Sequence, residues 1–331
     1  MSKILKIKKQ LSNITKYEAG ISKLANIKKV IKLSSNEGAF GPSLKALKTF
    51  KKFNNQIFRY PDPEVNKLRN AISKRYKLNK NNIICGNGSD EILAIIARIF
   101  SGPGDEILFS EYGFLMYPIV TQLAGAKGIK IKDVKHKNCL RNFFKAITKK
   151  TKWLILNSPS NPTGAGYTKD EIENLSKILI KHKKVHILSD DIYEHIKYDN
   201  FSFFTIAQIS KLKDRTLTMN GVSKSYAMTG WRIGYAAGPK EIIKAIGKIQ
   251  SQSTSNPSSV SQAAAVEALN GTQDFIKERS DAFKERRDFV VNSLNNIKGI
   301  SCLKPNGAFY VFPSCKKLLG KKTKLKTDTE F

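Results

Sequence analysis

The sequence predicts an α/β fold built on a mostly parallel sheet with helices on both faces. From Ile83 onward, short apolar runs alternate with stretches whose apolar residues recur every three or four positions. This order of strand and helix is typical of a parallel sheet that is covered on both faces. Polar clusters stand where several of the apolar runs end. No internal repeat is visible, and 331 residues suffice for one large domain or two moderate ones.

The chain before this alternating region is predicted to be an arm followed by two helices. Residues 1–35 are basic and partly amphipathic, and Pro42 is placed to start a helix over residues 44–53. Residues 59–63 read as a turn. Apolar residues then recur at helical spacing over residues 65–76.

The alternating region divides into elements as follows. Strands are predicted over residues 83–85, 104–109, 128–134, 153–156, 185–188, 216–220, 233–237 and 307–312. Helices are predicted over residues 92–100, 115–124, 140–147 and 168–183, after Pro239, after Ser258 and over about 274–294. Thr168 and Glu171 have the spacing of a capping box. Residues 316–331 are lysine-rich and are expected to fray.

The composition is that of a folded protein with no membrane span. Hydrophobic residues make up 40% of the chain, and no apolar run approaches the roughly 18 residues that a spanning helix needs. The N-terminus lacks the apolar core of a secretory signal. Cys85, Cys139, Cys302 and Cys315 are widely spaced, with neither CxxC nor zinc-ligand spacing. This pattern predicts reduced thiols, a cytoplasmic location and no metal site.

The net charge of +31 allows a nucleic-acid partner. However, the lysines are spread along the whole chain and arginine is scarce, whereas basic binding faces usually show clusters with interleaved aromatic residues. We therefore favour a compositional bias and predict no specific nucleic-acid partner.

The stretch from Ser223 to Arg232 is where we predict the chemistry. Lys224 follows an apolar strand and stands among small residues, so burial can lower the pKa of its amine and make it a nucleophile towards a carbonyl. The Ser223 hydroxyl and the Arg232 guanidinium suit a phosphate. An amine beside a phosphate clamp suggests pyridoxal phosphate held as a Schiff base. The alternative is a surface lysine in a loop.

Three further polar clusters also follow predicted strands, where ligands of parallel sheets bind. Ser89 and Asp90 suit an anion at a helix start, or act as an ordinary helix cap. Asp190 could pair with a protonated ring nitrogen, with Tyr193 reaching the ring hydroxyl; the alternatives are a loop cap and core packing. Asn161 could donate to the same ring oxygen, or only shape a turn with a cis proline.

An aromatic residue after the strand at 104–109 could stack on a flat ring. Phe114 is the first candidate and Tyr112 the second. Packing in the core is the alternative for either residue.

Together these residues resemble the fold-type I, pyridoxal-phosphate-dependent aminotransferases of class I and II, over roughly residues 30–315. The specific motifs are SPSNPTG at 158–164, SDDIYE at 189–194 and SKSYAMTGWRIGY at 223–235. The resemblance implies a large cofactor-binding domain over 39–270. It also implies a smaller α+β domain from an arm at 1–38 and an incomplete-looking segment at 271–331.

The two halves resemble different branches of this family. Residues 33–133, with GNGSDE and FSEYGFLMY, resemble histidinol-phosphate aminotransferases. Residues 151–315, with AMTGWRIGYAAGP and PNGAFYVFPS, resemble bacterial aspartate aminotransferases. The character changes near residues 134–150.

The resemblance also implies a role for each motif residue. Lys224 would be the Schiff-base lysine and proton carrier, Asp190 the partner of the pyridine nitrogen, Tyr193 and Asn161 the partners of the ring hydroxyl, and Phe114 the stacking ring. Ser89, Asp90, Ser223 and Arg232 would surround the phosphate. Tyr60 would reach the phosphate of a second subunit, which implies a homodimer, and Tyr17 and Asn36 would lie on the substrate side.

The resemblance implies amino transfer between an amino acid or amine and a 2-oxo acid such as 2-oxoglutarate, in amino-acid biosynthesis. The donor could be histidinol phosphate, aspartate or an aromatic amino acid. The family carries an arginine near its C-terminus for the substrate, and no arginine follows Arg287 here. The alternatives are therefore an inactive or truncated cofactor-binding protein, or another reaction of the cofactor such as β-elimination.

Overall fold

The structure is a computed structural model that describes residues 11, 12, 14, 16, 35–138, 140–320 and 327. The helices are α1 (Leu44–Lys52), α2 (Asn66–Tyr76), α3 (Ser89–Phe100), α4 (Met116–Ala124), α5 (Leu140–Ala146), α6 (Lys169–Lys181), α7 (Lys240–Ser251), α8 (Ser259–Asn270) and α9 (Asp274–Asn295). Short 3-10 helices are η2 (Phe53–Gln56), η3 (Lys80–Asn82), η4 (Ile206–Gln208), η5 (Ser210–Arg215), η6 (Thr229–Trp231) and η7 (Lys316–Leu318).

The strands are β1 (Ile83–Asn87), β2 (Glu106–Ser110), β3 (Lys127–Ile131), β4 (Asp133–Val134), β5 (Lys137–Asn138), β6 (Thr151–Asn157), β7 (His186–Asp190), β8 (Thr216–Gly221), β9 (Ile233–Ala237), β10 (Ser301–Cys302) and β11 (Pro313–Ser314). The central sheet has the order β1-β9-β8-β7-β6-β2-β3. Only β9 runs against its two neighbours in this sheet, and the other pairings are parallel. The predicted mostly parallel sheet is therefore confirmed.

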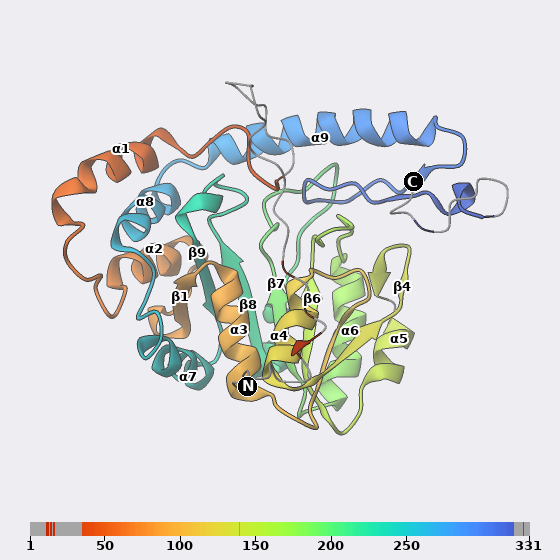
Figure 1. Ribbon diagram of the computed structural model, residues 1–331, viewed down its shortest axis with the longest axis horizontal. Coiled ribbons are helices and arrows are strands. Elements are labelled where there is room, and N and C mark those ends of the chain that lie inside the picture. Colours follow the sequence, from red (N-terminus) through yellow and green to blue (C-terminus); the bar gives the residue numbers. More distant parts are fainter. Residues whose placement is uncertain are drawn as a thin grey trace, which may run out of the picture.

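Helices cover both faces of the sheet because its inner strands are apolar on both sides. On β2, Ile107 and Phe109 pack with α3, α4 and α7, whereas Leu108 packs on the opposite face with α5 and α6. Near β1 and β9 that second face is covered by α2 and α8, and α1 packs on α8. In Figure 1, α1, α2 and α8 gather at one end of the sheet and α5 and α6 at the other. The described helices include none long and apolar enough to cross a membrane.

A buried arginine joins α9 to the loop that follows β7. Arg287 on α9 donates to both carboxylate oxygens of Asp199, at 2.9 and 3.2 Å, and to the carbonyl of Pro305 at 2.9 Å. The last arginine of the sequence thus has a structural ion pair. In Figure 1, α9 runs along the upper side of the molecule with the segment that carries β10 and β11 beneath it.

Two predicted strands were wrong. Residues 307–312 form a loop with a single bridge, Lys197 to Gly307, because Ala308 takes a left-handed backbone conformation (φ +57°) that interrupts an extended strand. Residues 128–134 divide into β3 and β4, and β4 pairs with β5 in a hairpin that turns at Lys135 and His136, both with positive φ.

Other predictions changed only at their ends. The predicted helix at 92–100 begins at Ser89, because Gly88 caps it and Asp90 and Glu91 favour its first turn. The capping box of Thr168 and Glu171 is confirmed. Cys85, Cys302 and Cys315 are free thiols, and Cys139 lies outside the described residues.

Candidate active site

A pocket lies where the carboxyl ends of β1, β6 and β7 and the loop after β8 meet. It encloses about 630 Å³ of space, counted out to its open mouth. Its lining comprises Asn36, Gly88, Ser89, Asp90, Phe114, Asn157, Asn161, Asp190, Ile192, Tyr193, Ser223, Lys224, Thr229 and Arg232. Because the strands β1, β6, β7 and β8 run in the same direction, residues far apart in the sequence converge at this edge.

Asp190 is the most deeply buried charged group of the pocket, with 4% of its surface exposed. Its Oδ2 accepts a hydrogen bond from the Tyr117 hydroxyl at 2.7 Å. Burial raises the pKa of the Asp190 carboxyl to about 6, against the lowering effect of the Tyr117 hydrogen bond. No described lysine or arginine nitrogen lies within ion-pair distance of this carboxylate, so the site suits a cation.

The opposite end of the pocket suits an anion. Ser89 and Asp90 begin α3, whose first N–H groups lack partners within the helix. The Arg232 guanidinium packs closely against Gly88, since a Cβ atom added at Gly88 would lie only 2.5 Å from Arg232 Nη2. Arg232 Nη2 also lies 3.5 Å from Asp90 Oδ2. A backbone turn, an arginine and a helix N-terminus therefore converge at one place.

Lys224 contributes the amine of the pocket. Its Nζ donates to the carbonyl oxygen of Asn36 at 3.4 Å and lies 5.7 Å from the centre of the Phe309 ring. Burial lowers the pKa of the Lys224 amine, and the Asp90 carboxylate opposes that shift. A partly desolvated amine of this kind is easier to deprotonate than a surface lysine.

The turn that carries Asn161 is built on Asn157, which ends β6. The Asn157 side chain accepts the Asn161 N–H at 2.7 Å and donates to the backbone carbonyl of Asp190 at 3.0 Å. The bonds Ser158–Pro159 and Asn161–Pro162 are cis. The Asn161 turn and Asp190 are thus held to each other through one side chain.

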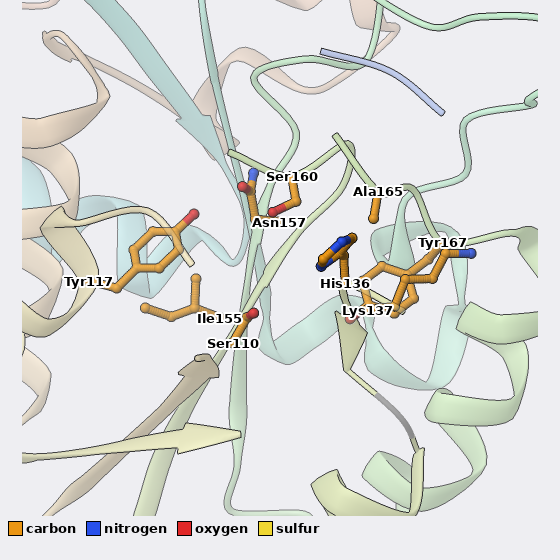
Figure 2. Close-up of a pocket in the computed structure, with 9 residues that line it drawn as sticks. All are labelled: Ser110, Tyr117, His136, Lys137, Ile155, Asn157, Ser160, Ala165 and Tyr167. Carbon is orange, nitrogen blue, oxygen red and sulfur yellow. The ribbon is translucent and has the colours of Figure 1, made fainter. Parts of the chain in front are cut away.

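A second, smaller space shares Asn157 with the larger pocket. Tyr117 stands on one side of it, and His136, Lys137 and Tyr167 stand on the other, with Ser160 and Asn157 at one end (Figure 2). Lys137 is paired with Glu171 at 3.0 Å, and burial lowers the pKa of His136. Tyr117 thus lines this space while it donates to Asp190.

The described pocket contains most of the residues predicted for it. Ser89, Asp90, Phe114, Asn161, Asp190, Tyr193, Ser223, Lys224, Arg232 and Asn36 all line it. Phe114 lies there rather than Tyr112, whose ring packs against His136 and Phe312. Tyr60 does not line it and is 97% exposed at the surface. Tyr17 lies outside the described residues.

Comparison with known proteins agrees with this geometry. The family model for aminotransferase class I and II matches residues 28–331. The chain belongs to the class I and II aminotransferase family. It is therefore a transaminase, and the family implies pyridoxal phosphate as cofactor.

Individual relatives of this transaminase are of the aspartate type. A probable aspartate/prephenate aminotransferase of Rhizobium leguminosarum bv. phaseoli is 47% identical over 285 residues, which are 82% of this chain and 71% of that protein. The crystal structure of the Rhizobium meliloti aspartate aminotransferase has a TM-score of 0.84 and 41% identity, and the match covers 90% of this chain and 78% of that one. The aspartate aminotransferase of Thermus thermophilus with maleate has a TM-score of 0.80 and 32% identity, with 85% and 76% covered. The histidinol-phosphate character of residues 33–133 stays a prediction.

The residues of this transaminase fit the cofactor that its family implies. Among the described residues, no lysine or arginine forms an ion pair with the buried Asp190 carboxylate, and a protonated pyridine nitrogen would supply such a cation. At the other end, a Cβ on Gly234 would lie 2.2 Å from the Ser89 nitrogen, so β9 lies directly against the turn suited to a phosphate. Lys224 lines the same pocket, and its amine is within the electrostatic reach of Asp90, Arg232 and Asp190. These residues therefore match the chemistry of pyridoxal phosphate, which has a flat ring with a protonated nitrogen, a phosphate arm and a carbonyl group.

Replacing Gly234 with alanine tests this cradle. The added methyl group must displace the Gly88–Ser89 backbone, so we expect pyridoxal phosphate to bind at least about tenfold more weakly and stability to fall by about 1–3 kcal/mol. Gly230→Ala is the matched control, because nothing lies within 4 Å of a Cβ there. Titration of the cofactor into the unloaded protein, with thermal melts, measures both effects. Wild-type affinity in Gly234→Ala would show that the turn does not hold the phosphate.

The sequence did not single out Tyr117, Asn157, Ile192, Thr229 or Tyr310. Asn157 could have been found by the pattern that identified the predicted residues, because it is a polar residue at the end of an apolar strand. Tyr117 lies in the first turn of α4, three residues after Phe114, which precedes that helix, and the two rings meet edge-on at 5.8 Å. The Tyr310 hydroxyl forms a hydrogen bond with the Tyr193 hydroxyl, across a separation of 117 residues that no local pattern reveals.

Proposed function

We propose that this chain uses pyridoxal phosphate to move the amino group of aspartate to a 2-oxo acid. The observation that carries the proposal is the single pocket that holds Lys224, the buried Asp190 and the anion-binding turn. The aspartate-type names of the relatives support the choice of donor. Prephenate is a candidate acceptor because the R. leguminosarum relative is named for it.

We assign the remaining roles to residues that line the pocket. Arg232, Ser223, Ser89 and the first N–H groups of α3 would hold the phosphate, and Phe114 would stack on the ring. Tyr193 and Asn161 would hydrogen-bond the ring oxygen. When bound, the cofactor supplies an electron sink next to the carbon that carries the substrate amine.

Two residues carry the chemistry of the chain itself. The Lys224 amine would hold the cofactor between turnovers. Once freed, it would take the proton from the α-carbon of the amino acid. Burial favours this second role, because a lowered pKa leaves more of the amine neutral. The ionised Asp190 carboxylate would keep the pyridine nitrogen protonated. A cation at that nitrogen also removes the cost that burial imposes on the carboxylate.

We propose a homodimer and the domain division given by the sequence. Tyr60 is fully available to reach a second subunit, since 97% of its surface is exposed. The division places a cofactor-binding domain at 39–270 and a smaller domain in the arm at 1–38 and the segment at 271–331.

Steady-state amino transfer tests the substrate assignment. We expect aspartate, with prephenate or 2-oxoglutarate as acceptor, to be used with a kcat/KM at least about tenfold above that of histidinol phosphate, which corresponds to about 1.4 kcal/mol in transition-state binding. Equal or better use of histidinol phosphate would overturn the choice of donor and support the histidinol-phosphate character of residues 33–133. Release of ammonia without amino transfer would favour β-elimination instead.

A further inference from the structure

The loop from Pro305 to Tyr310 reaches the active site from the C-terminal part of the chain. The N–H groups of Asn306 and Gly307 donate to the Gly164 carbonyl at 2.9 and 3.0 Å, and the Ala308 N–H donates to the Ile196 carbonyl at 2.9 Å. The loop is therefore wedged between the turn that carries Asn161 and the segment that carries Tyr193.

Close packing leaves this loop little freedom. A Cβ on Gly307 would lie 2.5 Å from both Pro159 and the Ile196 carbonyl oxygen. Ala308 is completely buried and has a positive φ of 57°. The Tyr198 hydroxyl donates to the Ala308 carbonyl from below. The next two side chains of the loop are consequently held in fixed positions.

Those two side chains contact the residues proposed to carry the chemistry. The Phe309 ring lies 5.7 Å from Lys224 Nζ and meets the Tyr193 ring edge-on at 5.6 Å. The Tyr310 hydroxyl is hydrogen-bonded to the Tyr193 hydroxyl, and the two rings are 5.5 Å apart.

The direction of the bond between the two hydroxyls follows from a count of protons. Each hydroxyl has one proton to donate, and the pKa of both is raised, mainly by burial, so both remain protonated at neutral pH. Asp190 is the charged group that acts on both of them. If Tyr193 donates its only proton to the cofactor's ring oxygen, the proton between the two tyrosines must come from Tyr310.

We propose that Tyr310 is a positioning residue that donates its hydroxyl proton to Tyr193 and so directs the Tyr193 proton towards the cofactor's ring oxygen. The inference rests on the proposed function, because it assumes that Tyr193 contacts that oxygen. It also gives the C-terminal loop a part in setting the protonation of the cofactor. Hydrogen bonds in such a chain polarise one another, so loss of the first donor weakens the second bond.

Tyr310→Phe tests the proposal, with Tyr198→Phe as the matched control. Both variants keep the aromatic ring and remove one hydroxyl that bonds this loop to the segment around residues 193–198, but Tyr198 donates to the backbone carbonyl of Ala308 rather than to a residue of the pocket. The readout is the pH titration of the visible absorption of the loaded protein without substrate. A weaker donor to the ring oxygen stabilises its ionised form less, so the midpoint in Tyr310→Phe should rise by roughly 0.5–1 pH unit.

The controls separate this role from a structural one. Tyr198→Phe should lower the melting temperature and leave the midpoint unchanged. In a Tyr193→Phe background, Tyr310→Phe should have no further effect on the midpoint. The inference would be overturned if Tyr310→Phe had the wild-type midpoint, or if Tyr310→Phe and Tyr198→Phe shifted the midpoint equally. It would also be overturned if Tyr310→Phe shifted the midpoint as much in the Tyr193→Phe background as in the wild type. Wild-type protein that develops no visible band with pyridoxal phosphate would instead overturn the proposed function.

Discussion

Lys224→Ala is expected to lose covalently held pyridoxal phosphate and to lower the rate of amino transfer by roughly 10²–10⁴-fold or more. Lys224 is the one lysine among the described residues that line the pocket, so no other lysine of that lining can take its place. In the proposed mechanism, alanine removes both the amine that holds the cofactor and the base that moves the substrate proton. The residues proposed to hold the phosphate, Arg232 and the start of α3, are unchanged in this variant.

Mass spectrometry after borohydride reduction measures the first effect. The loaded wild type should gain the mass of the reduced cofactor on the peptide that contains Lys224, and the variant should gain none. Single-turnover rates with aspartate measure the second effect. Lys244→Ala is the control, since Lys244 is a surface lysine that pairs with Glu241 at 3.4 Å. Retention of covalent cofactor by Lys224→Ala would show that another amine is the anchor.

Most of the site could be predicted because it depends on a rule of parallel sheets. Asp190 and Ser223 follow apolar runs whose carboxyl ends must meet at one edge, so local patterns were sufficient to bring them together. The alternation of short apolar strands with helices likewise predicted a sheet that is covered on both faces. These features are encoded within short stretches of sequence.

The residues that the sequence did not reveal depend on contacts between distant segments. Tyr117 lies in an apolar helix and reads as core, and only the structure brings its hydroxyl to Asp190. Residues 307–312 form an apolar and aromatic run like that of a strand, yet Ala308 turns left-handed because Gly164 and Ile196 accept hydrogen bonds from the loop backbone. That turn is what brings Tyr310 to Tyr193.

Asp190→Asn is expected to reduce amino transfer while it stabilises the protein that lacks cofactor. Without the carboxylate, the pyridine nitrogen loses the partner that keeps it protonated, and a neutral ring is a poor electron sink. Loss of one preorganised electrostatic partner typically costs roughly 10²–10³-fold in rate. The single-turnover rate with aspartate should fall by at least that factor, whereas cofactor content should fall much less because the phosphate contacts remain.

The stabilisation has a defined pH dependence, because the folded pKa of Asp190 is raised to about 6 from an ordinary value of 3.8. The folded state then binds the proton more tightly than the unfolded state, so the stability of the unloaded wild type falls as pH rises from about 4 through about 6. At pH 7.5 the buried carboxylate costs about 3 kcal/mol that asparagine avoids. Unloaded Asp190→Asn should therefore melt at a higher temperature than wild type at pH 7.5, with a smaller difference near pH 4.5.

Asp191→Asn is the matched control for the gain in stability and the loss of amino transfer that we expect in Asp190→Asn. Asp191 is also buried and its pKa is also raised by burial, but its carboxylate accepts from Ser189 at 2.7 Å and does not line the pocket. The control should stabilise the unloaded protein and leave amino transfer close to wild type. With the cofactor bound, the wild type should instead melt at a higher temperature than Asp190→Asn, because a cation beside the carboxylate stabilises only the wild type. If Asp190→Asn transfers the amino group at the wild-type rate, or if its melting temperature does not exceed that of wild type at pH 7.5, Asp190 is a structural residue rather than the partner of the ring nitrogen.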